Sequence, residues 1–280
     1  MPYMHRVRLV LVASLSMFVS VAGFGLASSP AHAQVEPVSE PPAEVWLSRT
    51  LAEQRRMDKF GRYAAAPVSI VLGGATALLP AVLDTSLASS IAYLGTTAFM
   101  LTSAVSLWAN EDPDEARRQY AFWGSLGFSA FGAGLILSCA TQDEVCPRAG
   151  LGRRLQVGVG AFEAGFFVSN AILALFMPPP SASALELSVK NLSGPERHAR
   201  VLEFLERRDR QRRVAAYISA PWGLAFGSFL LVEAAGADTT EAKAWLYGLG
   251  GSLLAFNLVA FLYDQLRRGD ADRLRAGEYP

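Results

Sequence analysis

A single carboxylate, Glu163, lies inside an apolar stretch that runs from Leu155 to Met177. Gln156, Glu163 and Asn170 share one face of the helix that this stretch predicts, because residues three and four apart align along a helix. An acidic group in hydrocarbon costs about 2.5–3.5 kcal/mol on insertion scales, and it commonly marks an ion or proton pathway. Glu163, Asn170 and Asn257 are therefore the candidate intramembrane polar site, for a proton or a cation.

The same residues also fit a structural role. A neutral Glu or an Asn that hydrogen-bonds across a helix interface holds membrane helices together, and Glu163 could also reach toward Arg153 or Arg154. The apolar runs contain no basic residue that could pair with Glu163. This argues against an arginine-lined anion pathway or a voltage-sensor helix.

The side chains that most enzymes use are missing from the apolar runs. The three histidines, His5, His32 and His198, lie outside them and offer no zinc ligand set or serine–histidine pair. No phosphate-binding Gly-x-x-x-x-Gly-Lys sequence occurs, and no motif is specific enough to indicate a family. We expect no enzymatic activity, no cofactor and no metal.

Two cysteines, Cys139 and Cys146, bracket the six residues ATQDEV. They are interpreted as a disulfide, which persists in an oxidising compartment. Two free thiols, one of them at a helix end, are the alternative.

Six apolar runs supply the elements that must position these groups. Each run is close to the roughly 20 residues that a helix needs to cross a bilayer. The chain is 51% hydrophobic and 18% charged, whereas soluble domains are about 25% charged. The runs are Ala64–Leu83, Leu87–Trp108, Gln119–Cys139, Leu155–Met177, Val214–Ala234 and Ala244–Tyr263.

The runs group into three hairpins, each preceded by a polar, partly amphipathic lead-in. The lead-ins are Glu44–Arg62, Asp112–Arg118 and Ser193–Arg213. Small residues recur at four-residue spacing in several runs, for example Ser69, Gly73 and Ala77, which lets helix backbones approach closely. The fold class predicted is an all-α membrane protein, a bundle of six transmembrane helices with amphipathic lead-in helices after an N-terminal signal peptide.

The N-terminus has the pattern of a secretory signal peptide, residues 1–33. It combines Arg6 and Arg8, an apolar core and an Ala-His-Ala ending. An uncleaved signal anchor is the alternative. Residues 34–43 are predicted to be a disordered tether, residues 44–268 the six-span domain, and residues 269–280 a flexible C-terminal tail.

Two topology signals disagree. The lead-ins and the C-terminal tail carry most of the arginines, which places them in the cytoplasm by the positive-inside rule. A cleaved signal peptide would instead deliver residue 34 to the outside, and six spans would return the C-terminus there. The predicted location is the cell membrane (a bacterial-type inner membrane, multi-pass), with the orientation undecided.

The function predicted is that of a non-enzymatic membrane protein with a structural or partner-binding role. The alternative is a small proton- or cation-coupled transporter or channel that uses Glu163. The partners expected are the lipid bilayer and a protein bound through the helix 193–213, whose apolar residues could instead lie on the headgroup surface. A formal net charge of zero gives no general attraction to nucleic acid.

Overall fold

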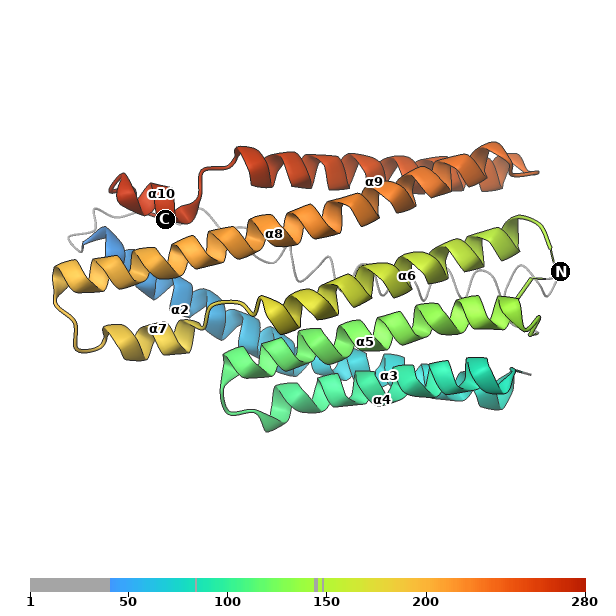
Figure 1. Ribbon diagram of the computed structural model, residues 1–280, viewed down its shortest axis with the longest axis horizontal. Coiled ribbons are helices and arrows are strands. Elements are labelled where there is room, and N and C mark those ends of the chain that lie inside the picture. The colour runs from blue at the N-terminus through green and yellow to red at the C-terminus, as the bar shows by residue number, and fades with distance from the viewer. Residues whose placement is uncertain (1–40, 84, 144–145, 148) are drawn as a thin grey trace. The chain divides into compact units, whose positions relative to one another are not determined.

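The structure is a computed structural model that describes residues 41–83, 85–143, 146–147 and 149–280. The predicted signal peptide and most of the predicted tether lie outside the described residues. Every regular element within them is a helix, as Figure 1 shows. The elements are α2 (Pro42–Phe60), the π-helical turn η1 (Gly61–Ala65), α3 (Ala66–Val82), α4 (Leu87–Ala109), α5 (Pro113–Ala140), α6 (Leu151–Phe176), α7 (Ala182–Val189), α8 (Gly194–Ala235), α9 (Thr240–Leu266) and α10 (Asp270–Arg275).

Six helices among the described residues are long and apolar enough to cross a membrane, which confirms the predicted fold class. The spans are formed by α3, α4, α5, α6, the C-terminal part of α8, and α9. Each span packs mainly on its neighbour in this order, so α6 joins the first three spans to the hairpin of α8 and α9. The chain is a polytopic membrane protein.

Polar side chains at the helix starts explain where several spans begin. The side chains of Ser86, Asp112 and Thr239 accept hydrogen bonds from the backbone N–H groups of Ser89, Asp114 and Ala242. Each satisfies a donor that a helix start leaves unpaired. Proline at the first or second position of α5 supports the same boundary.

The first lead-in, α2, continues into α3 through the π turn η1. In this turn the Ala66 N–H donates to the Gly61 carbonyl. The next donor in the π pattern would be the nitrogen of Pro67, which carries no hydrogen. Trp108 Nε1 on α4 donates to the Arg62 carbonyl instead, at 3.0 Å. A cross-helix bond thus satisfies the acceptor that the proline leaves free.

Glycines set the closest helix approach in the bundle. At the crossing of α5 and α6, a β-carbon at Gly132 would lie 2.6 Å from the Gly160 carbonyl oxygen and from the Ala164 amide nitrogen. Between α6 and α8, Gly158 and Gly165 lie under the rings of Phe229 and Trp222. Without water to drive helices together, such small-residue contacts supply packing.

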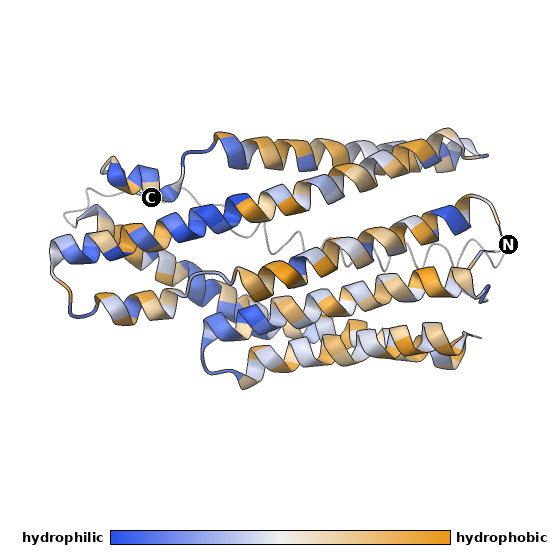
Figure 2. Cartoon of the chain, in the orientation of Figure 1, coloured by the Kyte–Doolittle hydropathy of each residue, from blue (hydrophilic) through white to orange (hydrophobic). Residues whose placement is uncertain are grey.

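Four segments far apart in the sequence form a small helical head outside the spans. We define the head as α2, α7, residues 194–213 of α8, and α10. Its core contains Trp46, Leu185, Phe204, Leu205 and Leu274, which come from all four segments. Figure 2 shows hydrophilic residues along the first half of α8 and hydrophobic ones along the spans.

Two features of the head differ from the sequence-based expectations. The apolar residues of the lead-in Ser193–Arg213 (Val201, Phe204 and Leu205) are buried against α2, α7 and α10, so the chain itself covers them. Residues 269–280, expected to be a flexible tail, contain α10, whose Ala271 and Leu274 are buried in the same core. Both differences have the same physical reason, because the apolar residues of α8 and of α10 pack in one core.

Candidate functional site

Glu163 lies on α6 where this helix crosses α5. Its side chain is 5% exposed, and its Oε2 atom has no hydrogen-bond partner among the described residues. The Glu163 β-carbon lies against Gly132, where an added β-carbon would come within 2.9 Å. The helix crossing thus holds a carboxyl group away from solvent with an unused acceptor. A buried polar atom left unpaired is costly and calls for an explanation.

Polar side chains lie on one side of Glu163, toward the connections at residues 83–86, 140–150 and 236–239. We call this end of the spans the loop end. Gln156 Nε2 donates to Ser138 Oγ at 3.0 Å and to the Leu135 carbonyl at 3.4 Å, linking α6 to α5. Tyr93 on α4 is fully buried, and its hydroxyl also lacks a partner among the described residues. The Tyr93 ring lies against Gly134 of α5, one helical turn before Ser138.

Asp143 closes this polar series at the loop end. Its carboxylate accepts hydrogen bonds from Ser89 at 2.6 Å, Thr141 at 2.7 Å and Ser86 at 3.2 Å. Burial by itself raises the pKa of Asp143, but the hydroxyl donors outweigh it and hold that pKa below its ordinary value. A carboxylate therefore stands charged beside the N-terminus of α4 at neutral pH.

The Cys139–Cys146 disulfide, with an S–S distance of 2.04 Å, closes the same loop. Arg153 donates to the Cys139 carbonyl at 3.2 Å, which ties the loop to the start of α6. Gly150 caps that helix at φ 80°, a conformation that glycine adopts without strain. The disulfide and these contacts position Asp143 against α4.

Aromatic rings lie on the other side of Glu163, toward the head. Phe167, one turn further along α6, stacks on Phe128 of α5 with ring centroids 4.6 Å apart. Phe166 meets Phe167 edge to face at 5.0 Å. Apart from the Ser129 hydroxyl, which donates to the Ala164 carbonyl at 3.2 Å, these aromatic rings line this side of the α5–α6 interface.

Neither predicted amide joins Glu163. Asn170 Nδ2 donates to the Phe166 carbonyl of its own helix at 2.8 Å, beyond the aromatic rings. Asn257 Nδ2 donates to the Leu253 carbonyl on α9, and its side chain fills the space left by Gly223 on α8. The buried polar groups on the loop-end side of Glu163 are instead Gln156, Ser138 and Tyr93. The sequence alone places Gln156 on the same helix face as Glu163. It does not single out Tyr93, because a tyrosine in an apolar run gives no distinguishing signal.

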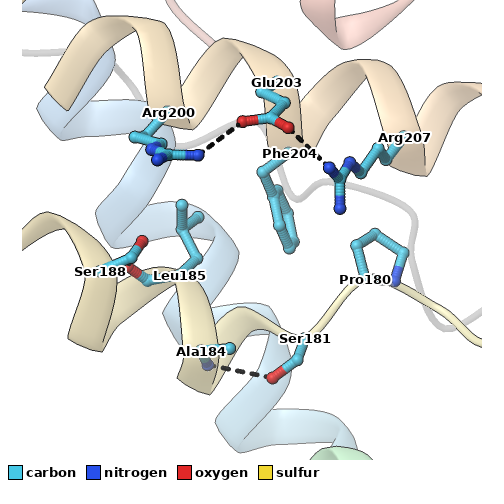
Figure 3. Close-up of a pocket in the computed structure, with 9 residues that line it drawn as sticks. All are labelled: Pro180, Ser181, Ala184, Leu185, Ser188, Arg200, Glu203, Phe204 and Arg207. Carbon is cyan, nitrogen blue, oxygen red and sulfur yellow. Dashed lines mark hydrogen bonds and ion pairs between the residues drawn. The ribbon is translucent and has the colours of Figure 1, made fainter. Parts of the chain in front are cut away.

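The head carries a second candidate site, a pocket of about 390 Å³ between α7 and α8. Figure 3 shows the Phe204 ring projecting between the two helices, with Leu185 and Pro180 beside it. Glu203 pairs with Arg200 at 3.0 Å and with Arg207 at 2.6 Å along the rim. The pocket combines a charged edge with an apolar lining, in which Phe204 and Leu185 are 8% and 6% exposed and also belong to the head core.

The Asp114 carboxylate connects the head to the spans through several hydrogen bonds. Its Oδ2 accepts from Gln54 of α2 at 3.0 Å, and from the hydroxyls of Ser181 and Ser183 at the start of α7 at 2.8 and 2.9 Å. Arg117 pairs with its other oxygen. One buried carboxylate at the start of α5 thus joins three segments.

Among the described residues, no three His, Cys, Asp or Glu side chains gather in a way that could hold a metal ion. Compared with protein-family models, curated proteins and solved structures, the chain shows no match.

Proposed function

We propose that this polytopic membrane protein has a non-enzymatic, partner-binding role carried out by its head. The observation that carries the proposal is the pocket between α7 and α8, with its apolar floor and paired arginines. The proposed location is the cell membrane of a bacterial-type cell.

The position of the pocket favours a partner in water over one in the bilayer. Phe204 and Arg200 precede Val214, where the apolar part of α8 begins, by ten and fourteen residues. At 1.5 Å of rise per residue these positions lie about 15 and about 21 Å along the helix from the hydrocarbon boundary. The pocket therefore faces the aqueous phase.

The chemistry of the pocket favours binding over catalysis. Its lining offers serines, arginines and one glutamate, and two arginines already engage that glutamate. Guanidinium groups keep several N–H donors free after one ion pair. Apolar side chains flanked by carboxylates on a partner protein would complement both parts of the surface.

A photo-crosslinking residue at exposed Ala184, in the full chain in its native membrane, tests the proposal. We expect a specific adduct that disappears when Arg200 and Arg207 are both replaced by Ala. Replacement of exposed Arg55 and Arg56, which line no part of this pocket, is the matched control. An adduct that survives in the Arg200/Arg207 variant, or no adduct at all, would reject this surface.

The segments of the head are separated along the chain by even numbers of spans, so all of them lie in one compartment. A reporter fused after Pro280 therefore reports the side of the membrane that the partner must occupy. The loop that holds Cys139 and Cys146 lies on the opposite side of the membrane, so the same reporter also shows whether these cysteines face an oxidising space.

A small transporter coupled to protonation of Glu163 is the second candidate, favoured by the unpaired Glu163 Oε2 atom. Purified protein in liposomes should then dissipate an imposed proton gradient, and Glu163→Gln should abolish the flux. Equal flux through wild type and Glu163→Gln would exclude this function.

A further inference from the structure

We propose that Glu163 is a reversible proton-binding site that is reached from the loop end and closed toward the head. The inference shares its residue with the transporter hypothesis, but it requires binding and release on one side only, with no net transport.

The route follows polar groups on three helices. Asp143 binds Ser89 at the N-terminus of α4, and Tyr93 lies one helical turn deeper on the same helix. The Tyr93 ring lies against Gly134 of α5, and Ser138, one turn further along α5, accepts a hydrogen bond from Gln156 of α6. Glu163 follows Gln156 by two helical turns. Hydroxyl, amide and carboxyl groups thus lie between the loop end and Gln156, two helical turns from Glu163.

Two atoms in this series have unused hydrogen-bonding capacity. Tyr93 Oη and Glu163 Oε2 are both buried and have no partner among the described residues. A phenol and a carboxyl group both donate and accept protons. Water that enters from the loop end would satisfy both atoms and carry protons between them.

The head side of Glu163 has fewer polar groups: the Ser129 hydroxyl of α5, which donates to the Ala164 carbonyl at 3.2 Å, is followed by aromatic rings. The stacked rings of Phe128 and Phe167, with Phe166 against them, occupy the next turn. Beyond them, Asn170 is bonded to its own helix. Gln156 and Asn170 are the amides seven residues before and seven residues after Glu163. Gln156 hydrogen-bonds across the α5–α6 interface, whereas Asn170 does not.

The surroundings favour a proton over a metal cation. Between Tyr120 and Cys139, α5 has no titratable side chain, and α4 contributes only Tyr93 along its span. On α8, Tyr217 lies near the head, and Glu233 at the loop end pairs with Arg154 at 2.7 Å. Glu163 is thus a lone carboxylate, whereas Na⁺- or Ca²⁺-type sites gather several oxygen ligands.

Infrared difference spectroscopy of the full chain in liposomes tests the proposal. We expect a carboxyl C=O band that titrates between about pH 4 and about pH 10 and that Glu163→Gln removes. Tyr93→Phe and Gln156→Leu should slow its hydrogen–deuterium exchange, on the order of tenfold or more. Asn170→Leu, the matched control, should leave the rate unchanged.

Three outcomes would overturn the inference. The first is the absence of any titrating band that depends on Glu163. The second is equal exchange in Tyr93→Phe and wild type, with Ser138→Ala as a second test of the same route if Gln156→Leu does not fold. The third is slowing by Asn170→Leu as strong as by Gln156→Leu, which would show access from the head. A wild-type protein that exchanges without moving protons between compartments would support the site and reject the transporter.

Discussion

The head and the membrane spans are held together by different forces, although α8 runs through both without a break. The head buries aromatic and aliphatic side chains, such as Trp46 and Leu205, and surrounds them with ion pairs. The spans instead expose large apolar side chains and meet through glycines, such as Gly132 and Gly160. The hydrophobic effect operates in the first region, where water is the alternative to burial. In the second region lipid removes that driving force, so close contact matters more.

Ion pairs illustrate the same contrast. In the head, Arg208 bridges α8 to Asp270 of α10 at 2.6 Å, and Arg197 bridges α8 to Glu44 of α2 at 2.5 Å. Within the spans, Glu163 has no charged partner. Changes that affect only one region should therefore act through different mechanisms, which the following predictions exploit.

Trp46→Ala should have the largest effect and act on the head alone. The side chain is 1% exposed, lies near the guanidinium groups of Arg49 and Arg273 (5.8 and 5.4 Å from its ring), and donates from Nε1 to the Glu278 carbonyl at 2.9 Å. Its removal should cost about 3–5 kcal/mol and expose the head to limited proteolysis. Trp245→Ala, at a side chain that is 65% exposed, is the control. Unchanged protease resistance of the head in Trp46→Ala would contradict its proposed core.

Gly132→Ala should act on the spans and leave the head intact. The new β-carbon would collide with backbone atoms of α6, which cannot move aside as a side chain can. We expect a loss of about 1–3 kcal/mol, measured as a lower thermal midpoint in detergent. Gly74→Ala, where an added β-carbon meets nothing within 4 Å, should have no such effect. Equal loss in both variants would mean that the contact at this crossing does not govern the stability of the spans, because Ala is the better helix former at both positions.

Asp114→Ala should uncouple the two regions. Asp114 is the shared acceptor for α2 and the start of α7, and it lies at the head end of α5. Loss of its charge-assisted hydrogen bonds should cost about 1.5–3 kcal/mol. Hydrogen exchange in α7 should rise while exchange in α5 and α6 stays constant. Glu115→Ala, which removes a more exposed ion pair with Arg118, should cost about 0–1 kcal/mol.

The sequence predicts the spans well because lipid imposes a length and an apolar composition on each one. It also identifies Glu163, since a carboxylate inside an apolar run stands out. The partners of Glu163 depend on how α5 and α6 cross, and the contact between Gly132 and Gly160 that fixes this register is not visible from one helix alone. Asp143 lies in a loop, and nothing local shows that it binds the start of α4.

The head was harder to predict for a related reason. The helices α7 and α10 have 8 and 6 residues, and isolated helices shorter than about 12 residues are marginally stable. Their formation depends on packing against α8 and α2, so no strong local sequence pattern predicts these two helices. The apolar stripe at Val201, Phe204 and Leu205 was visible, but the segments that cover it were not.

The loop end of the spans should show a smaller effect that depends on pH. The pKa of Asp143 is lower in the folded chain than its unfolded value of about 3.9. Its hydrogen bonds therefore stabilise the fold fully above that unfolded value, and the contribution is lost as the pH falls through the lower, folded pKa. Hydrogen exchange at the first turn of α4 should rise on acidification below about pH 4 in wild type. Asp143→Asn should exchange faster at neutral pH and lose this acid dependence, because an amide accepts hydrogen bonds without charge. An acid response that persists in Asp143→Asn would assign it to another group, and the polar route toward Glu163 would then lack its charged entrance.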